Sequence, residues 1–519
     1  MTKPEYSTSF TSFTFWGFIL MAIASVVPHM SMAQPVLGAR NTALGGGGTA
    51  YIAGFESTLW NPANLMVRNR SGQWHIGLGH FGILHEPVLS SSDANSQYSN
   101  FTNIYFPYQA KNVSISTKER DTILDNNYPS DRLKSEHQTR SDVILGGALW
   151  QNENEAFSIV ARARFASRIE VGRGWYSNDF AKLKNNDVRD FTLHQQRNHL
   201  YELSFGYSRE FTFLNGLSPQ INKLYIGIAP KLVLAGPGMN MKYDARYIRS
   251  KDGNRTTFAS SFSYQSTGSY SRALQAYRNG TSVSESIKNN FDRQLELNNT
   301  GYGLGFDWGV TYIIPLGNDF STINKGGKKS ITSKSIRVGL SLNDVGIIQH
   351  RTAPIQLEIP KDTVSTGLQP AVETMFIGSN GQYLSYFDQA TDLENPLLQS
   401  KNVDEDEFNT LLPTSLNAGI MIEYSRIKLM GDLTLGLKDN AFTNTKLAVH
   451  LGIEGYLLKQ LPIRAGTRIA SGLPTQVGLG TGIETKNWTF NISTQILIRS
   501  RTLTSELIGG AFAGLQFHF

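Results

Sequence analysis

Charged side chains recur at every second position of several otherwise apolar stretches, and they are the residues best placed for chemistry. In 157–171, Arg162, Arg164 and Arg168 share one face of an extended chain, because successive strand side chains point to opposite faces. The same parity extends this candidate lumen set to Asp307, Arg337, Arg464 and Arg468. Guanidinium groups lining an interior could bind an anion or a carboxylate. Inward carboxylates such as Asp307 allow a network of internal salt bridges instead, and the sequence leaves both open.

The sequence contains few other patterns that could support catalysis or metal binding. The acidic run 404–407 offers oxygen ligands for Ca²⁺ but lacks EF-hand spacing, so we expect a solvated loop. No G-x-S-x-G, H-E-x-x-H or P-loop pattern occurs, and there is no Cys for a disulfide or a thiolate site. The 48 basic and 42 acidic residues are too balanced to indicate nucleic acid. We therefore expect no enzyme, no cofactor, no bound metal and no nucleic-acid partner.

Strands of alternating character are the elements that would place these charges in one interior. The clearest is 301–314, where bulky residues from Tyr302 to Tyr312 point one way and glycines such as Gly309 point the other. Such a strand suits a lipid-facing wall with room inside. Alternation of this kind predicts roughly 14 to 17 strands. A single-chain bacterial barrel has an even number, so we expect an all-β, transmembrane antiparallel β-barrel of about 14 strands, with 16 as the alternative.

The N-terminal residues 1–33 have the features of a secretory signal peptide. Lys3 precedes an apolar run over 13–27, and Ser31-Met32-Ala33 is a small-x-small cleavage site. The run of roughly 15 residues is shorter than the ~20 that a transmembrane helix needs. We therefore expect cleavage near Ala33 and export of the mature chain.

The C-terminal stretch 505–519 is an alternating strand that stops on an aromatic residue. Phe519, Phe517 and Gly514 resemble the C-terminal assembly signal of bacterial outer-membrane barrels. Together with the export signal, this ending predicts a Gram-negative outer-membrane protein. Its expected partners are the barrel assembly machinery and outer-membrane lipid.

Three long polar segments divide the predicted barrel, which covers 71–519. They span about 91–140, 251–298 and 350–412, whereas the last third of the chain has only short turns. Outer-membrane barrels show this asymmetry, with long extracellular loops and short periplasmic turns. Pro230 lacks an amide hydrogen, so we expect a local break or bulge in the strand that contains it.

Two N-terminal motifs carry a resemblance to a known superfamily. Gly38-Ala39-Arg40-Asn41-Thr42-Ala43-Leu44-Gly45-Gly46 and Ser57-Thr58-Leu59-Trp60-Asn61-Pro62-Ala63-Asn64-Leu65 look like the mature N-terminus of the FadL-like superfamily. These are outer-membrane transporters of long-chain fatty acids and other hydrophobic compounds. Asn64 stands where glycine is usual. The same pattern occurs in a PorV-like branch, which serves type IX protein secretion in Bacteroidota.

The resemblance implies a 14-stranded barrel with an N-terminal hatch, here 34–70, folded into the lumen. It suggests that Asn61, Pro62 and Ala63 lie in this hatch. The run Gly45, Gly46, Gly47 and Gly48 would make it flexible, since glycine tolerates conformations that other residues avoid. Whether the segment shifts when ligand binds or acts as a static plug is left open.

Two functions follow from these expectations. One is passive transport of hydrophobic small molecules, such as fatty acids, across the outer membrane. The alternative is a barrel that does not transport but binds protein partners, such as a shuttle or plug component of type IX secretion. A continuous apolar lumen would favour the first, and a filled lumen with an ordered protruding loop would favour the second.

Overall fold

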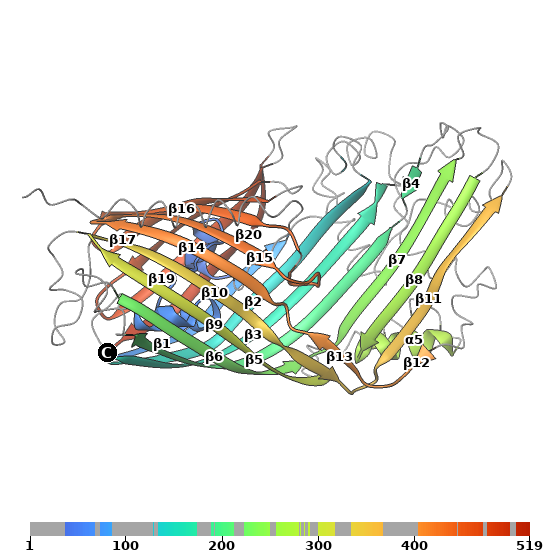
Figure 1. The fold of residues 1–519 in the computed structure, drawn as a ribbon, viewed down its shortest axis with the longest axis horizontal. Coiled ribbons are helices and arrows are strands. Elements are labelled where there is room, and N and C mark those ends of the chain that lie inside the picture. The colour runs from blue at the N-terminus through green and yellow to red at the C-terminus, as the bar shows by residue number, and fades with distance from the viewer. Residues whose placement is uncertain are drawn as a thin grey trace, which may run out of the picture.

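The computed structural model describes residues 37–67, 73–85, 128, 133–173, 188–190, 192–211, 223–249, 256–279, 281, 285, 289–290, 299–316, 334–366, 403–443, 445–470, 475–498 and 505–519. The predicted signal peptide, 1–33, lies outside these residues. Two bodies of strands stand side by side in Figure 1, a closed barrel and a sheet that projects from its rim.

The barrel is a ring of 14 antiparallel strands within the described part of the chain, as predicted. Each strand pairs with the next in the ring, and the last, β20, pairs with the first through contacts such as Ile76 with Phe517. The ring consists of β1 (Trp74–His85), β2 (Lys134–Gln151), β3 (Glu155–Gly172), β5 (Leu193–Phe211), β6 (Lys223–Ala235), β9 (Gly301–Pro315), β10 (Lys334–His350), β14 (Ser415–Tyr424), β15 (Ile427–Gly436), β16 (Ala448–Leu458), β17 (Leu461–Ala470), β18 (Thr475–Glu484), β19 (Trp488–Ile498) and β20 (Ser505–His518).

Side chains alternate between the outside and the lumen, as the strand patterns predicted. On β9, Leu304 is 65% exposed on the outside, whereas Asp307 and Gly309 are buried inside. Large apolar residues dominate the outer face of the ring, which suits contact with lipid. Among the described residues, no helix is both long and apolar enough to cross a membrane.

The two ends of the barrel differ as expected for this class. Tight turns at 425–426 and 459–460 join strands at one end, which we take as the periplasmic end. The projecting sheet and the described part of the connection 437–447 are at the other end. The predicted break at Pro230 occurs in one ladder only. The β5–β6 pairing is interrupted between Ser204–Lys231 and Tyr207–Ile228, while β6–β9 pairing continues.

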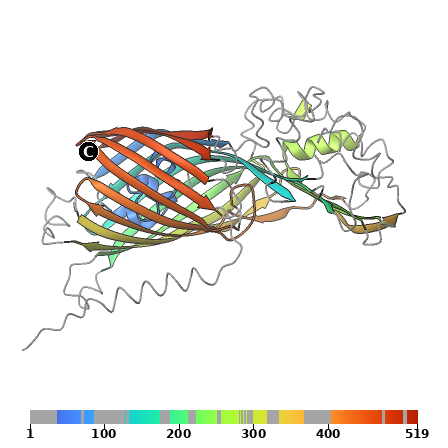
Figure 2. The ribbon, with the colours of Figure 1, turned by 90° about the horizontal axis from the view of Figure 1, so that it is seen from above.

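A sheet that we call the wing continues two barrel strands beyond the rim (Figures 1 and 2). The upper part of β5 pairs with β7 (Gly238–Arg249), which pairs with β8 (Thr256–Thr267) and then β11 (Ile355–Thr366). Short strands complete it: β4 (Val188–Asp190), β12 (Val403–Asp404) and β13 (Phe408–Leu411), the last on the upper part of β10. Helix α5 (Ser269–Arg278) follows β8.

The wing corrects the extents predicted for the three long loops. Residues 134–140 belong to β2, 256–267 and 269–278 form β8 and α5, and 355–366 and 403–411 contain β11, β12 and β13. Strands such as β8 are rich in serine and threonine on both faces. The sequence nevertheless predicts a polar hairpin over 243–264 that reaches beyond the membrane, and β7 and β8 pair as a hairpin there.

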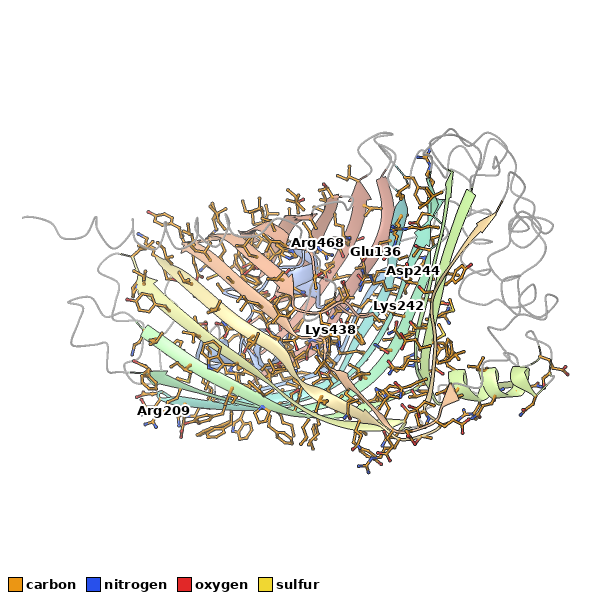
Figure 3. The ribbon with its side chains drawn as sticks, turned by 45° about the vertical axis from the view of Figure 1, so that its right-hand side comes forward. Glu136, Arg209, Lys242, Asp244, Lys438 and Arg468 are labelled. Carbon is orange, nitrogen blue, oxygen red and sulfur yellow. The ribbon has the colours of Figure 1, made fainter. Side chains whose placement is uncertain are left out.

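Charged side chains join the base of the wing to the barrel. His194 Nε2 on β5 lies 3.0 Å from Asp244 Oδ1 on β7, and Lys134 Nζ on β2 lies 3.7 Å from the same oxygen. The hydrogen bond with His194 lowers the pKa of Asp244 to about 2. In Figure 3, Lys242 and Asp244 lie on the wing, while Arg209 lies at the far end of the barrel. The wing is thus tied to the barrel by charges as well as by shared strands.

The N-terminal segment 37–67 lies inside the barrel rather than along its wall (Figure 1). It forms three single turns, α2 (Ala39–Ala43), η1 (Phe55–Leu59) and η2 (Pro62–Met66). Almost every residue of it is buried, and its apolar side chains form one cluster with inward residues of the ring such as Ile144, Tyr225 and Met421. The segment fills the cross-section of the lumen.

Inward-facing glycines make the room for this segment. A Cβ at Gly227 would lie 2.3 Å from the backbone of Pro62, and one at Gly478 would lie 2.0 Å from the carbonyl oxygen of Thr42. Most strands of the ring contribute such a glycine, and together we call them the glycine belt: Gly77, Gly82, Gly147, Gly206, Gly227, Gly309, Gly339, Gly419, Gly452, Gly466, Gly478 and Gly480. The segment therefore lies directly against the wall around the whole lumen.

A single methyl group on the belt tests this arrangement. We expect Gly227→Ala to push the Pro62 backbone off the wall and to destabilise the seated segment by about 1–3 kcal/mol. The N-terminal segment should then be cut faster by a protease, while the barrel keeps its heat-dependent gel mobility. The matched control is Gly431→Ala, where a new Cβ would have its nearest neighbour at 3.7 Å. Equal protection of the segment in both variants would contradict the role of the belt.

Candidate functional site

The N-terminal segment is held by hydrogen bonds to the wall as well as by packing. Asn61 donates to the Val310 carbonyl and to Thr311 Oγ1 on β9, at 3.2 and 2.9 Å. Thr311 in turn donates to Asn64 Oδ1 at 2.6 Å. Asn64, which replaces the glycine usual in the superfamily motif, also donates to the Thr49 carbonyl at 2.8 Å. These amides join the two halves of the segment and fix both to β9.

The predicted hatch residues lie at this contact with the wall. Asn61, Pro62 and Ala63 run past β6 and β9, and Ser208 on β5 donates to the Ala63 carbonyl at 3.2 Å. Gly45 and Gly46 have φ of +78° and +94°, a region that favours glycine. Gly47 and Gly48 face Asp432 and Trp60 at close range. In this structure the glycine run makes turns and close contacts inside the barrel.

A network of ion pairs lies below the segment, towards the periplasmic end. Arg464 contacts Glu454 at 2.6 Å and Glu484 at 2.5 Å, and it donates to Asn491 at 2.7 Å. Two residues of the segment join the network. They are Tyr51, which donates to Glu454, and Arg40, 3.7 Å from Glu484. The network closes the lower lumen with charged and hydrogen-bonded groups.

A second group of charges, the upper ion-pair cluster, lies towards the extracellular end. Arg164 Nη1 is 3.0 Å from Glu202 and 2.9 Å from Asp344, and Lys231 Nζ is 2.7 Å from Asp307. Cations and carboxylates are equal in number: Arg140, Arg162, Arg164 and Lys231 against Asp142, Glu202, Asp307 and Asp344. Their charges therefore balance within the barrel.

The connection after β15 folds inward and covers the upper cluster, and we call it the lid, residues 437–443. Phe442 is buried, and its ring lies 4.5 Å from the guanidinium carbon of Arg164. Around it, Ala166, Leu200, Val233, Ala235, Ile348, Leu412 and Ala441 form a small apolar cluster. Arg168, 3.2 Å from Asp439, holds the lid to β3. Phe442 and this apolar cluster thus lie over the charges of the upper cluster on the extracellular side.

The predicted lumen arginines face inward, and the described ion pairs show what occupies them. Arg162 and Arg164 belong to the upper cluster, Arg464 to the lower network, and Arg168 to the lid contacts. Arg337 contacts Glu423 at 2.8 Å, and Arg468 donates to Gln476 at 3.0 Å. These groups are engaged inside the protein.

Several central residues were missed by the sequence interpretation. Asp344 follows inward Asn343 and is itself inward, because β10 is irregular there and Asp344 has φ of +55°. Strict alternation would have placed it outside. Lys231, Asp142 and Phe442 were also not identified. In the sequence, only the pair Asn343-Asp344 within this strand indicates a bulge.

The wall itself is irregular beside the N-terminal segment. Alternation slips by one residue at Gly79 on β1 (φ +72°) and at Leu145 on β2, and β1–β20 pairing is interrupted between Gly77 and Phe81. Gly514 on β20 allows a close approach here, since a Cβ would lie 1.9 Å from the Leu78 carbonyl oxygen. We call this region the bulged wall.

One corner of the segment, residues 54–56, packs against the inner side of the bulged wall. A Cβ at Gly77 or Gly147 would strike the ring of Phe55. Next to it, Glu56 lies 2.6 Å from Nδ1 of His80. Gly54, before Phe55, has φ of +84° and open space around it. This corner separates the lumen from the outside of the barrel at that height.

The predicted assembly-signal residues lie on the terminal strand. Phe517 and Phe519 are on the outer face, and Phe519 closes the ring by donating its amide to the Trp74 carbonyl at 2.9 Å. Among the described residues, no group of His, Asp and Glu is arranged to hold a metal ion.

Comparisons with known proteins concern the whole barrel. A family profile described as "Family of unknown function (DUF5723)" matches residues 73–494. No curated protein matches the sequence significantly. Solved structures similar to the chain include the Pseudomonas putida toluene transporter TodX, with 10% identity and a TM-score of 0.40 over 95% of this chain and 99% of that one.

Two further structures show the same level of similarity. They are the Ralstonia pickettii toluene transporter TbuX (11% identity, TM-score 0.41, 93% and 99% covered) and a Pseudomonas aeruginosa FadL homologue (9%, 0.39, 95% and 100%). FadL-like proteins are the superfamily that the N-terminal motifs resemble.

The lower network gives a quantitative prediction. Arg464→Met leaves Glu454 and Glu484 short of a buried partner, and we expect it to lower the free energy of unfolding by about 3–5 kcal/mol. Urea unfolding of the protein in detergent, followed by tryptophan fluorescence, measures this change. Arg209→Met is the control. Arg209 is exposed, so its loss should change stability by less than about 0.5 kcal/mol. Similar losses in both variants would contradict the network's role.

Proposed function

The chain belongs to the DUF5723 family, and we propose that it passes small, uncharged hydrophobic molecules through the outer membrane by a lateral route in the barrel wall. The observation that carries this proposal is the bulged wall between β20, β1 and β2, backed from inside by Phe55 and Glu56. Bulges are common where a side chain changes direction or where strand pairing ends. Movement of this corner would connect the lumen with lipid.

The charges of the lumen favour a lateral path over an axial one. An apolar molecule moving straight down would have to separate the ion pairs around Arg464, where removing one partner leaves a charge buried and unpaired. An apolar molecule that leaves through the wall does not cross this network, and it arrives directly in the lipid. No group visible in the sequence couples the step to an energy source, so the flux would be diffusive.

The occupied arginines favour uncharged molecules over fatty-acid anions. A carboxylate headgroup would compete with Glu202 and Asp344 for Arg164, or with Glu423 for Arg337. An uncharged molecule needs no such exchange. The apolar cluster around Phe442 would be its first contact inside the mouth.

The segment 37–67 would act as the gate. Its corner at Gly54 has positive φ and free space, whereas Asn61 and Asn64 anchor the rest to β9. We therefore expect the η1 turn to move while η2 stays in place. Such gating movements are common in channels and enzymes that close over a ligand.

A second candidate function rests on the filled lumen and the ordered wing. This combination is the one expected of a barrel that binds a protein partner, with the wing strands β7, β8 and β11 as its contact surface. The transport experiment below separates the two candidates.

A reversible tether tests the gate. Thr58 Oγ1 on η1 lies 2.6 Å from Ser158 Oγ on β3, so cysteines at both positions should form a disulfide. The chain has no other Cys. In vesicles with an outer leaflet of lipopolysaccharide, which slows direct entry of hydrocarbons, we expect the oxidised Thr58→Cys/Ser158→Cys variant to take up toluene no faster than protein-free vesicles, and reduction to restore uptake. The single variant Thr58→Cys is the control.

The outcomes distinguish the proposals. Equal uptake by the oxidised and reduced forms would show that the η1 turn need not move. No uptake of either toluene or oleate by the native protein would overturn transport and favour the partner-binding candidate. Faster uptake of oleate than of toluene would overturn the preference for uncharged molecules.

A further inference from the structure

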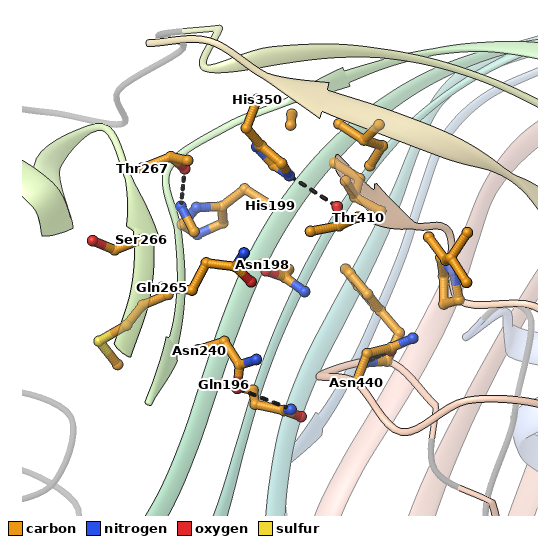
Figure 4. A pocket seen from close by; sticks show the side chains of 18 of the residues that line it. Gln196, Asn198, His199, Asn240, Gln265, Ser266, Thr267, His350, Thr410 and Asn440 are labelled. Atoms are coloured by element: carbon orange, nitrogen blue, oxygen red, sulfur yellow. Dashed lines mark hydrogen bonds between the residues drawn. The ribbon is translucent and has the colours of Figure 1, made fainter. Parts of the chain in front are cut away.

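A cavity lies where the wing leaves the barrel (Figure 4). Its walls come from the upper parts of β5 and β10, the start of β7, the end of β8, β13 and the lid. Its volume is about 160 Å³. An internal cavity of about 150 Å³ is known to hold one benzene ring; this cavity is open on one side, so it suits a six-membered ring whose substituents reach out of the opening.

Neutral carboxamides dominate the polar lining. Six of them surround the cavity: Gln196, Asn198, Asn240, Gln265, Asn409 and Asn440. Each carboxamide both donates and accepts hydrogen bonds. A ligand that presents several hydroxyl groups, each also a donor and an acceptor, matches such a set. The charged residues on the lining, Lys438 and Asp439, are opposite in sign, and Asp439 is engaged by Arg168.

Two buried polar atoms on the lining lack a partner within the described part of the chain. His350 is 8% exposed, and its Nε2 bonds to Thr410 Oγ1 at 2.9 Å while its Nδ1 has none. Gln196 donates to Asn240 at 3.2 Å, and its Oε1 is buried without a donor. Figure 4 shows both side chains in the cavity wall. Buried polar groups are normally satisfied, so these atoms point to a ligand.

Apolar surface completes the lining. Phe408 packs on His350 with ring centroids 4.8 Å apart, and Leu200, Ile348 and Phe442 lie on the side towards the barrel. A sugar ring has hydroxyls at its edge and C–H groups on its faces, and therefore needs both kinds of surface. A plain hydrocarbon would leave the carboxamides and His350 Nδ1 unpaired, at a cost in affinity.

We propose that this cavity, which adjoins the apolar cluster around Phe442, is a binding site for one neutral sugar residue. Its hydroxyl groups bond to Gln196, Asn240 and His350, and its C–H face rests on Phe408. The sugar ring contacts the lid, so binding of the sugar also holds residues 437–443 in place. The sugar could be free in solution or the terminal residue of a surface glycan, since both present the same chemistry.

The test is direct binding to the full-length protein in nanodiscs. Titration calorimetry with glucose, galactose, mannose and N-acetylglucosamine covers the free sugars, and polysaccharide released from lipopolysaccharide covers the surface glycan. We expect at least one neutral sugar to bind. Gln196→Met and Asn240→Ala should each weaken it by about five- to tenfold, the loss of one hydrogen bond. Tighter binding of the polysaccharide than of its free terminal sugar would identify the glycan as the source.

The matched control is Gln195→Met, because neighbouring residues of a strand point to opposite faces and Gln195 is not on the lining. It should bind like the native protein. Heat-dependent gel mobility confirms that each variant is folded. Absence of binding by every neutral sugar, or equal affinity of the native protein and both cavity variants, would overturn the proposal. Sugar binding is measured in the absence of toluene, so its failure is read separately from a failure of the transport test.

Discussion

The close approach of the segment 37–67 to the inner wall is the constraint on which the rest of the structure depends. A backbone can lie this near to a strand only where the strand has no Cβ, and the glycine belt supplies such places around the ring. On β9 the belt accounts for Gly309, which faces Asn61 and Pro62, whereas Gly305 leaves room for Leu412 instead. In each strand of the glycine belt, apolar residues contact lipid outside while the glycine lets the segment 37–67 approach inside.

The described residues of the segment pack against inward residues of many strands of the ring. Hydrogen bonds through Asn61 and Asn64, ion pairs around Arg464 and the upper cluster occupy much of the described lumen. Under the proposed function, a molecule would pass where the strands of the wall are incompletely hydrogen-bonded and where the segment 37–67 makes few contacts with them. The bulged wall is the place where the β1–β20 ladder is interrupted and where the segment turns at Gly54, with φ of +84°.

The wing adds a second surface to the same strands. β5 and β10 change partners along their length, from barrel neighbours below to wing strands above. The site at the mouth exists only because of this change, since its lining comes from both bodies and from the lid. The barrel interior and the mouth site are therefore mechanically linked through β5, β10 and Phe442.

Local sequence was sufficient for the barrel. Alternation with period two depends only on neighbouring residues, so it identified the wall strands, their inward arginines and the break near Pro230. The glycines and the Asn-Pro turn likewise marked 37–67 as a segment apart. Tertiary structure alone decided the rest. One bulge reverses the direction of every later side chain, which is why Asp344 could not be placed. The partners of each arginine, the position of Phe442 over the upper cluster and the pairing of β8 with β11 depend on contacts between residues far apart in the chain, and no local pattern records such contacts.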